Sequence, residues 1–138
     1  SENMRQITVR LQPNEDLRGG IERIAREHHI RAGCILSIVG GVKNANLRMA
    51  GSTPEAQIMR GWNEPMEIVS GTGTISPDGC HIHASFSRTD GSVIGGHLRH
   101  GCIIALTAEI VLLAFNDVRY ARERDEETGF PELAVSQQ

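Results

Sequence analysis

The sequence predicts a single domain of the α+β class, in which one helix near the N-terminus accompanies a series of strands. A length of 138 residues is typical of one compact domain with its own hydrophobic core. Apolar residues recur at helical spacing in one segment, 17–25, whereas most other apolar segments are short or alternate with polar residues, as strands do. We expect the domain core to span about residues 5–121, followed by a C-terminal tail over residues 122–138.

The composition resembles that of ordinary globular domains, with 39% hydrophobic and 22% charged residues. No apolar run approaches the roughly 20 residues that span a bilayer, and the N-terminal residues lack the pattern of a signal peptide. The 3 cysteines form no C-x-x-C pair, which argues against both a disulfide framework and a thiolate zinc site. We therefore expect a cytoplasmic protein with reduced thiols and no membrane contact.

The first third of the chain contains a predicted strand, the helix and a second strand. Apolar and polar residues alternate over residues 5–11, which is typical of a half-buried strand. Asn14 or Asp16 can cap the helix that follows, because their side chains accept hydrogen bonds from its first backbone amides. An apolar run over residues 32–39 has strand length, and Gly40-Gly41 marks a bulge or bend before residues 42–49 continue as strand.

The remaining chain adds only strands and connections to this prediction. Residues 50–65 are polar and contain two of the prolines, so we expect an exposed connection. We predict strands over 66–75, 80–87 and 102–115, a return strand that begins at 92–94, and an edge strand over 118–120. Residues 122–127 form a mixed charge run on the surface, and the chain after Pro131 is expected to be loose.

Four of the 6 histidines lie between Cys80 and Gly101. Alternation along residues 80–87 places His81 and His83 on one side of a strand, together with Ser85 and Ser87. A hairpin turn over Arg88–Gly91, followed by Gly95-Gly96, could bring His97 beside this pair. Three neutral imidazoles can hold a divalent metal such as zinc and leave one coordination position open, as catalytic zinc sites do.

Two alternatives to this metal site remain open on spacing alone. His81 and His83 could face solvent on an edge strand, while His97 helps to close a turn. His100 could replace His97 as the third ligand, although no glycine pair precedes it and Arg99 places a positive charge beside it. His28 and His29 fall at the predicted helix end, where exposed histidines are common.

Glu109 is the one charged residue in the apolar run from Cys102 to Phe115. Burial of a carboxylate is costly unless it is paired or bound to something. Glu109 could therefore pair with a buried arginine such as Arg48, ligate a metal, orient a histidine, or act as a general acid or base. It is the candidate catalytic residue, and Glu67 is a second carboxylate that could fill the same role.

Several segments resemble the plants-and-prokaryotes-conserved (PPC) domain family from about Arg10 to Leu113. They are RLQPNEDL, HIRAGCILSIVGGVKNANLR, EIVSGTGTIS, HIHASFSRTDGSVIGGHL and GCIIALTAEIVLL. The most specific part is H-x-H followed by D-G-x-V-x-G-G-H-L. The resemblance implies a compact α+β domain with a mainly antiparallel sheet that assembles as a homotrimer, with a metal site at His81, His83 and His97. The fold is also similar to that of acetolactate decarboxylase, a metal enzyme with a His-x-His plus His site.

The same resemblance implies a connection with DNA, because plant members join this domain to AT-hooks and act on chromatin. This chain contains no R-G-R-P core of an AT-hook, and its formal net charge is −3. Domains that bind nucleic acid by themselves usually carry a basic excess, which is absent overall. The plant pattern G-R-F-E-I-L, tied to partner contacts, matches only at Glu67 and Ile68.

Three functions are consistent with the sequence. The first is a stand-alone PPC-domain protein that binds DNA in regulation and carries a three-histidine divalent-metal site. The second is a metal-dependent enzyme or a sensor of a small molecule, with a site like that of acetolactate decarboxylase. The third is a structural trimer module whose histidines stabilise a turn. The sequence alone leaves enzymatic activity open.

Overall fold

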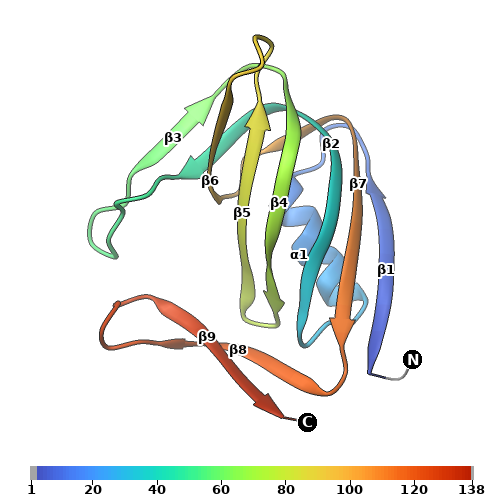
Figure 1. Ribbon diagram of the computed structural model, residues 1–138, viewed down its shortest axis with the longest axis vertical. Helices are drawn as coiled ribbons and strands as arrows, with labels where there is room; N and C mark the ends of the chain where they lie inside the picture. The colour runs from blue at the N-terminus through green and yellow to red at the C-terminus, as the bar shows by residue number, and fades with distance from the viewer. Residues whose placement is uncertain (1–2, 138) are drawn as a thin grey trace.

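The computed structural model describes residues 3–137, which form one α-helix and nine β-strands (Figure 1). The elements are, in chain order, β1 (Met4–Leu11), α1 (Leu17–Glu27), β2 (Gly33–Arg48), β3 (Met59–Trp62), β4 (Met66–Ser76), β5 (Gly79–Ser87), β6 (Val93–Leu98), β7 (Ile103–Phe115), β8 (Val118–Arg124) and β9 (Pro131–Gln137). Among the described residues, no helix is long and apolar enough to span a bilayer.

Seven of the strands form one antiparallel sheet, which confirms the predicted α+β class with a mainly antiparallel sheet. The strand order is β1-β7-β2-β4-β5-β6, and β3 adds to β2 beside this path. β8 and β9 pair only with each other as a separate two-stranded sheet. In Figure 1 this hairpin lies below the ends of β4 and β5.

The helix α1 covers one face of the large sheet and buries its apolar side there (Figure 1). Asp16 caps the helix as predicted, because its carboxylate accepts a hydrogen bond from the amide of Gly19 at 2.7 Å. Leu17, Ile21 and Ile24 are almost fully buried. Burial of each such side chain contributes about 1.5–3 kcal/mol, so this contact is a main source of the stability of the fold. The opposite face of the sheet is not covered by a helix.

The long strand β2 connects the two parts of the sheet because it bends. Its first half pairs with β7 and β4, whereas its last residues pair with β3 and β6. The register with β7 shifts around Gly40, where the sequence predicted a bulge or bend. Gly40 has φ +157, a conformation that L side chains rarely adopt, and a side chain there would meet the backbone of Thr107. The bend brings the end of β2 to the candidate site.

One prediction for the middle of the chain was wrong in part, and the predicted start of the return strand was confirmed. The connection over residues 50–65 contains β3, whose residues are mostly exposed and pair with β2 through backbone atoms. Because backbone pairing needs no apolar alternation, the sequence pattern did not reveal this strand. The return strand also continues through Gly95-Gly96 to Leu98, so His97 belongs to a strand rather than to a turn.

The prediction of a loose chain end after Pro131 was also wrong. Residues 131–137 form β9, which pairs along its whole length with β8 from Val118↔Gln137 to Arg124↔Pro131. A tight turn joins the strands, in which Gly129 has φ +76 and its amide donates to the carbonyl of Asp125. Leu133 and Val135 are exposed, so backbone pairing rather than side-chain burial defines this hairpin.

Candidate metal centre

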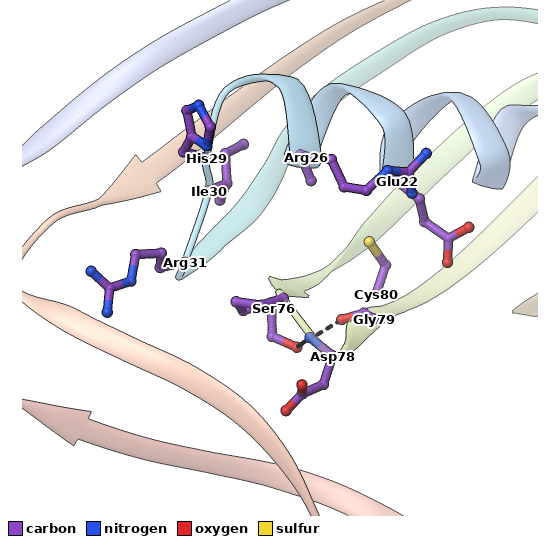
Figure 2. Close-up of a pocket in the computed structure, with 11 residues that line it drawn as sticks. Glu22, Arg26, His29, Ile30, Arg31, Ser76, Asp78, Gly79 and Cys80 are labelled. Carbon is purple, nitrogen blue, oxygen red and sulfur yellow. Dashed lines mark hydrogen bonds between the residues drawn. The ribbon is translucent and has the colours of Figure 1, made fainter.

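His81 and His83 lie on β5 and face away from the helix. The alternation predicted for this strand is present, because Cys80, Ile82, Ala84 and Phe86 are buried between more exposed residues. Figure 2 shows the sulfur of Cys80 pointing toward α1. The histidines, one residue further along, therefore occupy the face of the sheet that the helix leaves uncovered.

His97 reaches the same place from β6, where it is the direct register partner of His83. The glycine pair before His97 allows β6 to lie close enough to its neighbouring strands for this pairing. A Cβ atom at Gly96 would lie 2.8 Å from the carbonyl oxygen of Arg48, and one at Gly95 would lie 2.9 Å from that of Ala84. Glycine is thus required where β6 packs closely against both β5 and the end of β2.

The structure brings the three histidines together into one cluster. One potential ligand atom from each residue lies within 4.8 Å of the others. The ring centroids are 5.0 Å apart for His81 and His83, 5.1 Å for His81 and His97, and 5.8 Å for His83 and His97. Nitrogen ligands about 2.0–2.1 Å from one zinc ion are roughly 3.4 Å apart, so small side-chain rotations would bring the three residues to one divalent ion.

The surroundings favour the neutral imidazole, which is the form that binds metal. Burial, followed by the charge of Arg48, lowers the pKa of His97 to about 3. Burial also lowers the pKa of His81, with a further contribution from the charge of Arg122. Both rings are therefore uncharged at neutral pH, and little competition from protons is expected at these two ligands.

Hydroxyl groups surround the cluster on the neighbouring strand. Thr72 and Thr74 of β4 are the register partners of His83 and His81. A cavity of about 570 Å³ opens beside His83 and His97, and its lining includes Arg48. Further polar lining comes from the hydroxyls of Ser70, Thr72 and Ser85. A small molecule in this cavity would meet hydrogen-bonding groups next to the three imidazoles.

Glu109 is not buried, so the premise of its predicted role was wrong. It is exposed on β7, between the buried residues Ala108 and Ile110. Its register partners are Arg10 of β1 and Val39 of β2, and β2 and β4 separate β7 from β5 in the sheet. The apolar run did not reveal this exposure because the uncovered face of the sheet also carries apolar side chains.

Arg48, the proposed partner of Glu109, belongs instead to the histidine cluster. Its Nη2 lies 3.3 Å from Nδ1 of His97, and its Cζ lies 5.1 Å from the centroid of the Phe130 ring. The predicted pairing of Glu109 with Arg48 was therefore wrong. No sequence signal pointed to Phe130, because it lies far along the chain in a segment without a recognisable pattern.

His100, the alternative third ligand, and Glu67, the second carboxylate candidate, both lie outside the cluster. His100 is exposed, and its Nε2 is 2.7 Å from a carboxylate oxygen of Glu22. Glu67 is exposed near the start of β4, where it pairs in register with Ser87 and Gly41. Among residues 3–137, only His81, His83 and His97 form a group of three or more potential metal ligands.

A separate cavity of about 510 Å³ lies between the C-terminal half of α1 and the turn from β4 to β5. Figure 2 shows Glu22 and Arg26 on the helix side, with Cys80 and Asp78 across from them. Burial, followed by the charge of Glu22, raises the pKa of Cys80 to about 11. The thiol is therefore protonated at neutral pH and is a poor nucleophile or metal ligand.

The fold and the cluster together define a class of protein, an α+β domain whose antiparallel sheet carries a candidate three-histidine metal centre on its uncovered face. Residues 1–116 match the Plants and Prokaryotes Conserved (PCC) domain family. The chain therefore belongs to this family, as the sequence motifs predicted.

Among curated proteins, the chain is 39% identical over 133 residues to the bifunctional protein GlmU of Synechococcus sp. (strain JA-3-3Ab). The match covers 96% of this chain but 21% of that protein. A second GlmU from Synechococcus is 40% identical over 127 residues, with 20% of its length covered. The chain thus spans about one fifth of the length of these curated relatives.

Solved structures share the fold over most of the chain or nearly all of it. A hypothetical protein from Salmonella has a TM-score of 0.91 and 25% identity, with 98% of this chain and 95% of that chain covered. The metal-containing protein AF0104 from Archaeoglobus fulgidus has a TM-score of 0.83 and 29% identity, with coverages of 94% and 93%. A Staphylococcus aureus protein described as similar to α-acetolactate decarboxylase has a TM-score of 0.50 and 17% identity, with coverages of 76% and 50%, and shows the fold alone.

Proposed function

We propose that this chain is a metal-dependent domain that binds a small molecule at a zinc centre held by His81, His83 and His97. The observation that carries this proposal is the convergence of one potential ligand atom from each histidine within 4.8 Å. Three histidine ligands leave a coordination position for water or for an oxygen atom of the bound molecule. The description of the Archaeoglobus relative as a metal-containing protein supports the proposal.

Polar side chains beside the three histidines can form hydrogen bonds with such a ligand. A bound zinc ion would supply Lewis acidity to an oxygen atom of the ligand. Arg48 donates toward the site from the end of β2, and the hydroxyls of Thr72 and Ser85 line the adjoining cavity. These groups can orient a polar molecule through hydrogen bonds. Both an enzyme and a sensor would require the binding of a small molecule at this centre.

Metal analysis of the purified protein tests this proposal directly. We expect about one zinc ion per chain, with the content lost in His81→Ala and in His97→Ala because each removes one of three ligands. His100→Ala is the matched control, since His100 lies outside the cluster and should leave the metal content unchanged. A wild-type protein with little metal, or retention of metal in both ligand variants, would refute the site.

We also propose that the chain assembles as a homotrimer through the uncovered face of the sheet. Leu36, Val39 and Val69 are 61%, 59% and 54% exposed on β2 and β4, each beside a buried core residue. Contiguous exposed apolar surface is typical of protein interfaces. Light scattering coupled to size exclusion should give a trimer mass for the wild type and a smaller mass for Val39→Asp. A wild-type monomer at working concentrations would contradict the assembly.

Binding of DNA is the second proposed function, and a group of arginines beside the histidines supports it. Arg18, Arg48, Arg99 and Arg122 line one cavity, although the net charge of the whole chain is −3. Binding of duplex DNA at low salt, with an affinity that falls as salt rises, would support this function. Absence of binding at low salt would exclude it.

A further inference from the structure

Four arginines from four parts of the fold converge beside the histidine cluster. They line a cavity of about 290 Å³ that also includes His81 and His97. The arginines come from α1, the end of β2, the residue after β6 and the strand β8, namely Arg18, Arg48, Arg99 and Arg122. Guanidinium groups repel one another, so their concentration in one depression indicates that an anion is expected there.

The fold holds two of these guanidinium groups in position. Arg48 lies over the ring of Phe130, with its Cζ 5.1 Å from the ring centroid. Arg122 donates from Nη2 to the hydroxyl of Thr74 at 2.9 Å. The backbone amide of Arg122 also donates to the carboxylate of Asp78 at 3.0 Å. These contacts restrict the side chains before any ligand binds, which lowers the entropic cost of binding.

Carboxylates compensate only part of the positive charge. Arg18 pairs with Glu22 at 3.4 Å, and Asp78 and Glu132 are the acidic residues in the cavity lining. Within residues 3–137, no carboxylate lies at ion-pair distance from Arg48 or Arg99. Burial, followed by the charges of Arg99 and Arg18, also holds the pKa of Arg48 below its usual value. The cavity therefore has unpaired positive charge next to the candidate metal ligands.

We propose that the four arginines form the subsite for the phosphate group of a phosphorylated small molecule, whose other end reaches the three histidines. The subsite deepens the proposed function and rests on it, because the histidines fix the second end of the ligand. A phosphate monoester carries up to two charges and presents several acceptor oxygens, which suits convergent guanidinium groups. The cavity is a depression of limited volume rather than an extended groove, which favours a small molecule over a nucleic acid.

The hairpin of β8 and β9 completes this subsite. Arg122, Phe130, Pro131 and Glu132 of the hairpin line the cavity. The family match ends at residue 116, before the hairpin begins at Val118. The metal ligands thus lie in the part of the chain that matches the family, whereas part of the phosphate subsite lies outside it. The hairpin therefore contributes directly to the lining of the proposed subsite.

Titration calorimetry with inorganic phosphate and with glycerol 3-phosphate tests the subsite, on the full chain both metal-free and loaded with zinc. We expect saturable binding by the wild type in both states. The double variant Arg48→Gln/Arg99→Gln should weaken binding at least about tenfold, because it removes two of the guanidinium groups that no carboxylate pairs. The single variant Arg99→Gln should weaken binding less, and it should retain zinc because Arg99 is not one of the potential metal ligands.

Arg119→Gln is the matched control for these variants. Arg119 is an exposed residue of the same hairpin that does not line the cavity, so its loss should leave phosphate affinity unchanged. Equal affinity in the double variant and the wild type, or no saturable binding by the wild type, would overturn the subsite. Melting curves of the variants check that each remains folded.

The outcomes separate the subsite from the metal centre. If the wild type binds no zinc but its phosphate binding is lost in the double variant, the proposed function fails and the subsite stands. If zinc binds to the wild type and phosphate does not, the subsite fails and the metal centre stands.

A parallel titration uses short duplex DNA. Binding of DNA that phosphate displaces and that the double variant abolishes would assign the arginines to nucleic acid and overturn the small-molecule ligand.

Discussion

The guanidinium of Arg48 lies 3.3 Å from Nδ1 of His97, and the two residues are direct register partners on β2 and β6. Because a guanidinium can only donate hydrogen bonds, Nδ1 of the imidazole is the acceptor in this contact. A neutral ring is required for this arrangement, since the imidazolium has a hydrogen atom on both nitrogens. The pairing of β2 with β6 therefore places the positive charge of Arg48 where it disfavours the imidazolium form of a candidate metal ligand.

The first prediction concerns the pKa of His97. Burial is the main cause of its lowered value of about 3, and the charge of Arg48 is the second. Arg48→Met should therefore raise the pKa of His97 toward the ordinary histidine value, without restoring it fully because burial remains. Histidine resonances followed by NMR over a pH series in the metal-free protein measure this change. Arg119→Met is the control, and an unchanged His97 titration in Arg48→Met would contradict the assignment.

The second prediction concerns the acid stability of the metal-free protein. The pKa of His97 is about 3 in the folded state and about 6.5 in an unfolded chain. The unfolded state therefore binds more protons between these values, and the free energy of unfolding should fall as the pH decreases from about 6.5 toward 3. His97→Gln should show a shallower decrease in urea unfolding experiments over this range. A variant with the same pH dependence as the wild type would exclude His97 as a source of the effect.

The third prediction concerns the glycine pair that precedes His97. In Gly96→Ala, the new Cβ would lie 2.8 Å from the carbonyl oxygen of Arg48, so β6 must move away from β2. Such overpacking costs typically 1–3 kcal/mol, and the shift should also weaken zinc binding. Urea unfolding and zinc titration measure the two effects. Gly61→Ala is the matched control on a neighbouring strand, because its Cβ would meet no atom closer than 3.8 Å.

The sequence predicted the parts of the structure that depend on local patterns. Alternation along residues 80–87 placed His81 and His83 on one face, and the glycine pair indicated why His97 could join them. The helix cap at Asp16 followed from the same kind of local chemistry. These features depend on the preferences of a few neighbouring residues, so a single sequence is sufficient to recognise them.

Features that depend on contacts between distant segments were not predictable in the same way. The proximity of Arg48 to His97 arises from the bend in β2, and that of Phe130 arises from the hairpin of β8 and β9. Glu109 was expected to be buried because its neighbours are apolar, although those neighbours alternate between two faces of the sheet. The apolar residues of the uncovered face obscured that alternation.

The last prediction separates a metal centre from a structural role of the histidines. A ligand that binds only the folded state stabilises it, by about 2.7 kcal/mol when its concentration is 100 times its dissociation constant. Chelation should therefore lower the melting temperature of the wild type, and added zinc should restore it. His83→Ala should no longer respond to either treatment, because it lacks one of the three ligands.

Glu109→Gln and His100→Ala serve as controls for the chelation experiment. Both residues lie outside the cluster, so both variants should respond to the chelator and to zinc as the wild type does. A wild-type melting temperature that is the same with and without chelator, together with an unchanged oligomeric state, would favour a structural trimer module. A response that persists in His83→Ala would instead place the stabilising ion elsewhere in the protein, because two imidazoles and an open face hold zinc too weakly to reproduce the wild-type effect.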